Sequence, residues 1–154
     1  MSIISDAIQA KCLAFSDRII KLNDYLLAQA AMEHEKYKKE LRQRKPGQKT
    51  SSILHLPSSI PLHLQAVSNL CNQLLRSGTS VGANNAEASS AISKADFKSK
   101  SYIALKEARE SMYWLELLHR NNYLTDIQFN SLYADAEELV KVLTHRCKKL
   151  DGVE

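Results

Sequence analysis

The sequence predicts an all-α protein, an antiparallel up-down four-helix bundle formed by a single domain over residues 1–154. Two observations carry this prediction. Four stretches place apolar residues three and four positions apart, which aligns them along one face of a helix. Only four Gly and three Pro occur, so few breaks separate these stretches. Short turns between the last three stretches favour antiparallel neighbours.

The first predicted helix begins near Ser5 or Asp6 and can continue through the alanines at 28–31 into a charged run. Lys45-Pro46-Gly47 ends it, because proline removes a backbone donor and restricts the preceding residue. A Ser- and Pro-containing loop follows, so we interpret residues 35–60, approximately, as a basic insertion between helices one and two. The apolar seam of the first helix is Ile8, Cys12, Phe15, Ile19, Leu22 and Leu26.

The second predicted helix starts at Ser59, a suitable N-cap with Pro61 in the first turn, and runs to about Ile92. Gly78 and Gly82 lie one turn apart within it, and each costs ~1 kcal/mol of helix propensity relative to Ala. We expect another helix to approach closely there and to supply packing in return. The seam of this helix is Val67, Leu70, Leu74, Ser77, Val81, Asn84, Ala88 and Ala91.

Capping signals delimit the third and fourth predicted helices. Ser93 with Asp96, and Thr125 with Gln128, have capping-box spacing. The pair at 121–122 is Asn-Asn, which tolerates the left-handed conformation that ends a helix. The third helix has its seam at Leu105, Ala108, Met112, Leu115 and His119, flanked by Ala104, Ser111 and Leu118. The fourth has its seam at Phe129, Leu132, Ala136, Leu139, Leu143 and Cys147.

Bulk properties narrow the functional classes. Cys12, Cys71 and Cys147 form no CxxC pair and lie near apolar faces, so buried reduced thiols are expected. No segment approaches the ~20 apolar residues that span a bilayer. We therefore expect a cytoplasmic protein without membrane contact, and no cofactor is indicated.

Two segments resemble a known family. Gln73–Ala88 reads QLLRSGTSVGANNAEA, and Phe97–Leu118 reads FKSKSYIALKEARESMYWLELL. Both are similar to the corresponding helices of bacterial four-helix bundle proteins related to the 23S rRNA intervening-sequence protein. The match covers helices two to four closely and residues 15–27 more loosely. The chain departs from the family pattern between about residues 28 and 60, where relatives have a shorter link.

The resemblance implies an antiparallel bundle that assembles into a ring-like homopentamer. Relatives include the accessory protein of diversity-generating retroelements, a basic pentamer that binds nucleic acid and a reverse transcriptase. RNA, DNA and a reverse transcriptase are therefore the partners that the resemblance implies. Most members of the family have no established activity, so the resemblance indicates no enzyme.

The densest basic run lies in the insertion, with Tyr37 interleaved and Glu40 as its one acidic residue. Such clusters bind phosphate backbones through counterion release. The alternative interpretation is a helix end and linker that charge keeps soluble. The candidate nucleic-acid-binding residues are Lys36, Lys38, Lys39, Arg42, Arg44, Lys45 and Lys49, with the tail residues His145, Arg146, Lys148 and Lys149 as the next candidates.

Polar residues near the expected interior suggest a network between helices, because buried charges need partners. We expect Asn84 or Glu87 to contact the third helix and so to set register or a subunit contact. The alternative interpretation of these residues is a catalytic dyad. The sequence offers no nucleophile together with a base and an orienting group, so it does not favour that alternative. The candidates for this network are Arg76, Asn84, Glu87, Glu107, Arg109 and Glu110.

Two smaller patterns complete the candidates. Glu116 and His119 have the Glu-x-x-His spacing of dimetal bundles, but those proteins need the motif twice, and a second copy is lacking. Tyr113 and Trp114 are adjacent, so one of them should lie on an outer face and serve an oligomer contact. The first hypothesis is a non-enzymatic homo-oligomeric bundle associated with nucleic acid or acting as a scaffold. A protein-binding adaptor is the alternative, and a dimetal enzyme the remote one.

Overall fold

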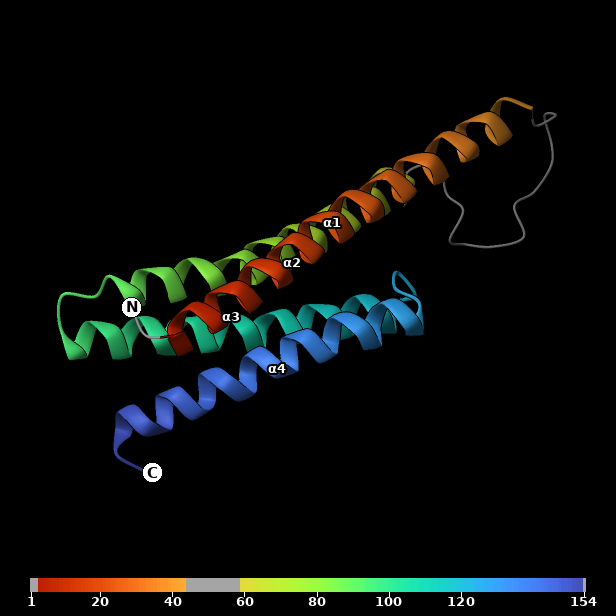
Figure 1. Ribbon diagram of the computed structural model, residues 1–154. Helices are drawn as coiled ribbons and strands as arrows, with labels where there is room; N and C mark the ends of the chain where they lie inside the picture. The colour runs from red at the N-terminus through yellow and green to blue at the C-terminus, as the bar shows by residue number, and fades with distance from the viewer. Residues whose placement is uncertain (1–2, 44–58, 154) are drawn as a thin grey trace.

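The computed structural model describes residues 3–43 and 59–153, and these residues form four helices (Figure 1). The helices are α1 (Ile3–Gln43), α2 (Ser59–Ser89), α3 (Lys94–Arg120) and α4 (Asp126–Asp151). Within the described ranges the chain has no strand. The predicted all-α four-helix bundle is confirmed.

Each helix packs along its neighbours in the sequence, and α1 and α4 close the bundle through a sparser contact. The end of α1 and the start of α2 extend together beyond the turn that joins α3 to α4 (Figure 1). The last buried residue of α1 is Ala30, and the described side chains from 31 to 43 are exposed or half-buried. The charged end of α1 therefore contributes little to the core.

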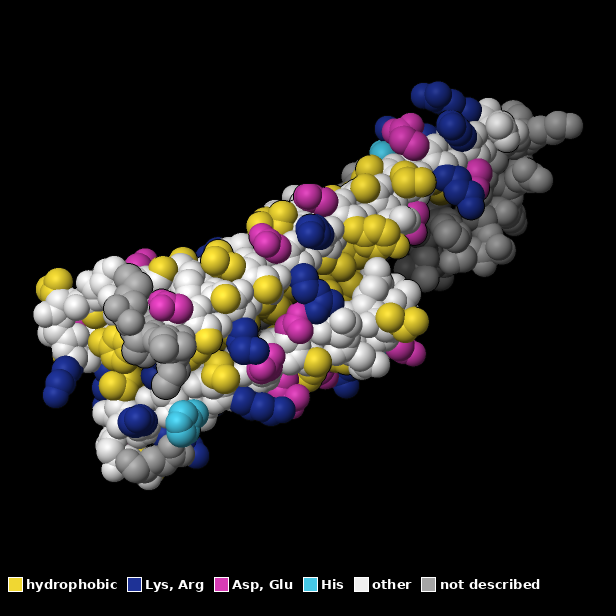
Figure 2. Space-filling view, viewed as in Figure 1, with side chains coloured by type: hydrophobic (Ala, Val, Ile, Leu, Met, Phe, Trp, Pro, Cys, Tyr) yellow, Lys and Arg dark blue, Asp and Glu magenta, His cyan; other side chains and the backbone are white. Residues whose placement is uncertain are grey.

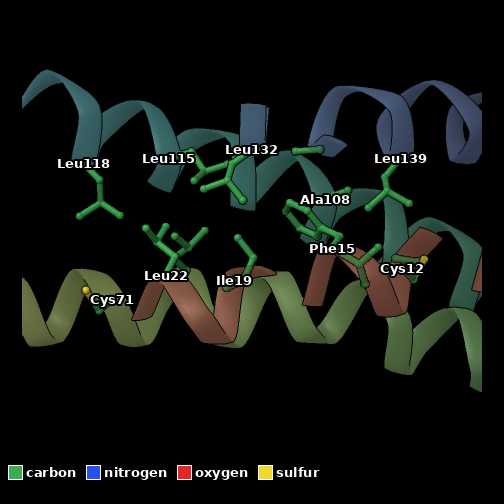
Figure 3. Close-up of a cluster of buried hydrophobic side chains, with 14 of the residues drawn as sticks. Cys12, Phe15, Ile19, Leu22, Cys71, Ala108, Leu115, Leu118, Leu132 and Leu139 are labelled. Carbon is green, nitrogen blue, oxygen red and sulfur yellow. The ribbon is translucent and has the colours of Figure 1, made fainter. Parts of the chain in front are cut away.

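Most of the seam residues that the spacing predicts lie in one continuous core, although Met112 and His119 of the third seam are half-buried. All six seam residues of the first helix are buried, and so are five of the six on the fourth, with Phe129 half-buried. Figure 3 shows Ile19 and Leu22 of α1 pointing toward Leu115 of α3 and Leu132 of α4. Each fully buried large aliphatic side chain contributes ~1.5–3 kcal/mol through the hydrophobic effect. The core thus links all four helices.

Two seam predictions on α2 are off by one residue. The prediction placed Leu70 and Asn84 on the seam, and both are half-buried. Their neighbours Cys71 and Asn85 are the buried residues. The cause is that α2 contacts both α1 and α3, so its buried arc is wider than a single seam. Residues one position along, about 100° around the helix axis, still fall inside that arc.

The two helical glycines allow α1 to approach α2 closely, as the sequence suggests. A Cβ placed on Gly78 would lie 3.0 Å from Cγ1 and 3.2 Å from Cγ2 of Ile19. A Cβ on Gly82 would lie 3.3 Å from Cβ of Cys12. Ser16 also donates a hydrogen bond to the carbonyl of Gly78, at 3.3 Å. The backbone of α2 is therefore in direct contact with α1 side chains.

The predicted caps form with one difference. Thr125 and Gln128 make a reciprocal capping box at the start of α4. Asn122, in the turn that follows α3, adopts the predicted left-handed conformation, with φ of 62°. The Ser93 hydroxyl accepts from the backbone N–H of Asp96, but the Asp96 carboxylate accepts from Ile92 rather than from Ser93 itself. Helix α2 ends at Ser89, three residues before the expected Ile92.

The three cysteines are buried free thiols. Burial raises the pKa of the Cys12 and Cys71 thiols to about 11, and it also raises the pKa of Cys147. None of the described helices is both long enough and apolar enough to cross a bilayer.

Candidate functional site

The basic run of α1 lies on the end of the helix that extends past the α3–α4 turn. Lys36, Lys38, Lys39 and Arg42 are all exposed, and Lys38 pairs with Glu35 at 2.8 Å. Figure 2 shows Lys and Arg side chains at this end of the molecule, together with a few acidic ones. The other three candidates of this run, Arg44, Lys45 and Lys49, lie outside the described residues.

A second basic surface lies at the opposite end of the bundle, where the start of α1 faces the last turns of α4. The two helices border a groove of about 610 Å³ there. Three aliphatic side chains, Ala7, Ile8 and Val142, line part of it, and the other lining residues are basic. Those basic residues are Lys11, Lys141, His145, Arg146 and Lys149.

Arg146 connects this groove to the interior of the bundle. Its guanidinium donates to Oδ1 of Asn85 at 2.7 Å, and Asn85 donates to Oε1 of Gln9 at 2.5 Å. Gln9 in turn donates to the carbonyl of Gly82, at 3.4 Å. The guanidinium carbon also lies 5.7 Å from the centre of the Phe97 ring, within cation–π range. The contacts of Arg146 and Asn85 therefore connect side chains from all four helices.

The sequence did not single out Asn85 or Gln9 for a network, and it placed Arg146 in a solvated tail. Asn84 instead donates to the carbonyl of Ser80 on its own helix, at 2.9 Å. The expectation that Asn84 reaches another helix is therefore corrected. Asn85, which is buried, holds the place from which an α2 side chain reaches both α1 and α4.

Glu87, the other residue expected to contact the third helix, does so: it forms an ion pair with Lys100 of α3. Glu110 accepts a hydrogen bond from Nε1 of Trp114 on its own helix, at 3.0 Å. Burial and the neighbouring Glu110 raise the pKa of Glu107, while the charge of Arg76 lowers it. Arg76 and Arg109 have exposed side chains, so these six residues form a polar surface rather than one buried network.

Two serines link α2 to α3 inside the core. Ser77 and Ser111 are both fully buried, and their hydroxyl oxygens lie 3.0 Å apart. Their small side chains let the two helices approach, and each hydroxyl also bonds to a carbonyl of its own helix. The signal in the sequence is that Ser77 interrupts the predicted seam of the second helix and that Ser111 flanks the seam of the third.

Of the two adjacent aromatics, Tyr113 is on the outer face, with 57% of its surface exposed, and Trp114 is half-buried. Their rings meet edge to face, with centroids 4.9 Å apart. The expectation that one of them faces outward is confirmed, and the oligomer contact stays a prediction.

The Glu-x-x-His pair does not converge on a shared site. Glu116 is exposed and lies 3.7 Å from Arg120, whereas His119 contacts Asp126 at 2.8 Å and stacks on Phe129. Across residues 3–43 and 59–153, His, Cys, Asp and Glu form no group of three that could hold a metal ion.

Fold and surface together define a helical bundle protein with basic surfaces at both ends. The chain belongs to the 23S rRNA-intervening sequence protein family, whose model matches residues 48–145. It is similar to a crystal structure of a protein with unknown function from the S23 ribosomal protein family of Bacteroides thetaiotaomicron. The two share 34% identity over 95% of this chain and 99% of the other, with a TM-score of 0.66. No curated protein matches the chain.

Proposed function

We propose that this chain is a non-enzymatic, homo-oligomeric helical bundle that associates with nucleic acid through the basic end of α1. The observation that carries this proposal is the exposure of Lys36, Lys38, Lys39 and Arg42 on a helix end that adds little to the core. Residues 35–43 carry these four cations and two acidic side chains, Glu35, which pairs with Lys38, and Glu40. Since folding does not require this charge, binding to a polyanion is the function that it suits.

The basic end is also suited to recognition without sequence preference. Lysine and arginine contacts to phosphates fix position on a nucleic acid but carry no sequence information. Tyr37 is half-buried and lies in the sequence among these cations. An interface of this kind binds all sequences alike and weakens steeply with salt.

Assembly into a homopentamer, which the family resemblance implies, would repeat this basic end five times. Multivalent contacts then raise the apparent affinity without any new interaction. Tyr113 is the contact that we propose for assembly, because a large ring exposed beside Trp114 is typical of protein interfaces.

The test of nucleic-acid association is fluorescence anisotropy with single- and double-stranded RNA and DNA over a range of salt. Changing Lys36, Lys38, Lys39 and Arg42 to Gln should weaken binding to every probe. It should also flatten the log–log salt slope by ~0.7–0.9 for each phosphate that the variant no longer neutralises. An unaltered affinity and slope would refute the assignment to α1, and no binding by the parent protein at low salt would refute nucleic-acid association.

A charge-matched control is available on other faces of the bundle. Lys21, Lys94, Lys106 and Arg109 are exposed, and changing them to Gln removes the same charge and the same residue types. This control should retain most of the affinity. Equal weakening in both variants would show that net charge, rather than the end of α1, accounts for binding.

Assembly is tested separately by light scattering coupled to gel filtration. Tyr113→Glu should reduce the mass of the assembly, because it places a charge in the proposed contact. Tyr25, which is 47% exposed on α1, provides the matched control as Tyr25→Glu. A monomer mass for the parent protein at micromolar concentration would refute the assembly.

A further inference from the structure

The α1–α4 side of the bundle is closed by polar bridges rather than by continuous apolar packing. Arg18 pairs with Asp135 and donates to Oγ of Ser131 at 2.8 Å, and Lys11 pairs with Glu138 at 2.7 Å. Beyond these bridges, toward the start of α1, the two helices border the groove of about 610 Å³.

The lining of this groove combines two chemistries. Ala7, Ile8 and Val142 supply an aliphatic surface that a helix or an acyl chain can cover. The other lining residues, Lys11, Lys141, His145, Arg146 and Lys149, are basic, and none of the lining residues is acidic. A ligand that fits must therefore be apolar on one side and anionic on the other.

Arg146 is the lining residue whose charge most needs an anionic partner. It is half-buried, yet in the described part of the chain it has no carboxylate partner and one hydrogen-bond acceptor, Oδ1 of Asn85. A guanidinium has five N–H donors, and charged groups out of water are normally paired. Lys149, one helical turn further along α4, also lacks a carboxylate partner among the described residues, whereas Lys11 and Lys141 pair with Glu138 and Glu137.

We propose that this groove is a docking site for an acidic amphipathic helix of a partner protein. One carboxylate of that helix binds Arg146 and Lys149, and its aliphatic side chains cover Ala7, Ile8 and Val142. A helix suits a groove between two helices, since it presents apolar side chains three and four residues apart along one face.

The composition of the groove favours a protein helix over nucleic acid. No Phe, Tyr or Trp lines it, so an unpaired base would find only the imidazole of His145 and the guanidinium of Arg146 to stack on. Its aliphatic surface would gain nothing from a phosphate backbone. The groove also lies ~40 Å from the basic end of α1, since about 25 helical residues separate Lys11 from Lys36. The proposal is therefore independent of nucleic-acid binding at α1.

The probe for this proposal is a labelled peptide of about four helical turns, with Leu along one face and Glu on the others. Binding is followed by fluorescence anisotropy with the full-length protein. Two peptides serve as controls: one with Lys in place of every Glu, and one with the same composition scrambled so that no apolar face forms. Only the acidic amphipathic peptide should bind at micromolar concentration.

Adjacent lysines provide matched protein variants. Lys149 lines the groove, whereas Lys148 is exposed and does not line it. Lys149→Glu should weaken binding of the acidic peptide on the order of tenfold, and Lys148→Glu should change it little. Arg146→Gln should weaken binding further, with circular dichroism used to confirm that the helices remain folded. Because Lys149 has no carboxylate partner in the described chain, its variant remains informative even where Arg146→Gln does not fold.

Several results would overturn the proposal. Equal binding to the Lys148→Glu and Lys149→Glu proteins would place the peptide elsewhere, and equal binding of the basic peptide would exclude charge recognition. Displacement of the peptide by single-stranded RNA in the Lys36, Lys38, Lys39 and Arg42 variant would make the groove a nucleic-acid site. A fall in the mass of the assembly on Lys149→Glu would show that a second copy of this chain occupies it. Failure of the acidic peptide to bind while sodium decanoate does would identify a lipid-like ligand.

Discussion

The close contact between α1 and α2 at Gly78 makes a sharp prediction about stability. A methyl group at this position gains ~1 kcal/mol in helix propensity. It must also fit 3.0 Å from Cγ1 and 3.2 Å from Cγ2 of Ile19, which is fully buried and would have to shift by a few tenths of an ångström. Overpacking of this kind costs ~1–3 kcal/mol. We therefore expect Gly78→Ala to lower the free energy of unfolding by up to ~2 kcal/mol, measured by urea denaturation followed by circular dichroism.

Two further variants identify the contact responsible. Gly82→Ala meets a single near atom, Cβ of Cys12 at 3.3 Å, so its stability should stay within about 1 kcal/mol of the parent. Ile19→Ala costs ~2–5 kcal/mol alone, but it removes the two nearest of the three Ile19 atoms that a Cβ at 78 would meet. In the Gly78→Ala background it should therefore cost ~1–3 kcal/mol less. A Gly78→Ala protein more stable than the parent, or strictly additive effects, would show that the two helices can separate slightly at no cost.

Three other predictions test the caps, the polar contacts and the thiols. Thr125→Ala should lower stability by ~1 kcal/mol, because the backbone N–H of Gln128 loses its acceptor; an unchanged urea midpoint would contradict the capping box. Asn85→Ala should cost ~1–3 kcal/mol, since it removes the acceptor of Arg146 and the donor to Gln9, whereas Asn84→Ala should have little effect in the same assay. Because the folded chain keeps thiol protons up to a pKa of about 11, the free energy of unfolding should fall as pH rises from about 9 towards 11. Replacing Cys12 and Cys71 by Ala should flatten that dependence, and an unchanged slope would assign it to other groups.

The sequence predicts the core because burial at each seam depends on spacing within one helix. Ile8, Phe15 and Leu26 lie where a 3.6-residue period puts them, whatever the neighbouring helices do. Caps are equally local, so Thr125 with Gln128 could be recognised from four residues. Fold class and helix ends are therefore largely determined by information that lies close together in the chain.

The candidate surfaces depend on how the helices meet, and there sequence reasoning was less successful. Asn84 and Asn85 are chemically identical neighbours, and only the position of α1 decides which of them is buried. Arg146 looks like part of a solvated basic tail, although it precedes the seam residue Cys147 by one position. Its inward turn requires Asn85 and Phe97, from two other helices, at the same height in the bundle. Neither the distance from Arg146 to Asn85 nor that from Arg146 to Phe97 can be predicted from the periodicity of a single helix.

The distribution of charge connects the two basic surfaces. Residues 36–43 carry four Lys or Arg side chains and one Glu, and residues 139–150 carry four Lys or Arg side chains and no Asp or Glu. The net charge of the chain is +4, less than these two segments carry together, so the remainder is net acidic. A protein that is basic at both ends and acidic between them directs anionic partners to its ends and away from its sides. The Debye length at physiological salt is ~8 Å, and the two ends of the bundle are several such lengths apart. Binding of a partner at one end should therefore leave the affinity of the other end nearly unchanged. Simultaneous binding of RNA at α1 and of the acidic peptide at the α1–α4 groove, with additive free energies, is the behaviour that this separation requires.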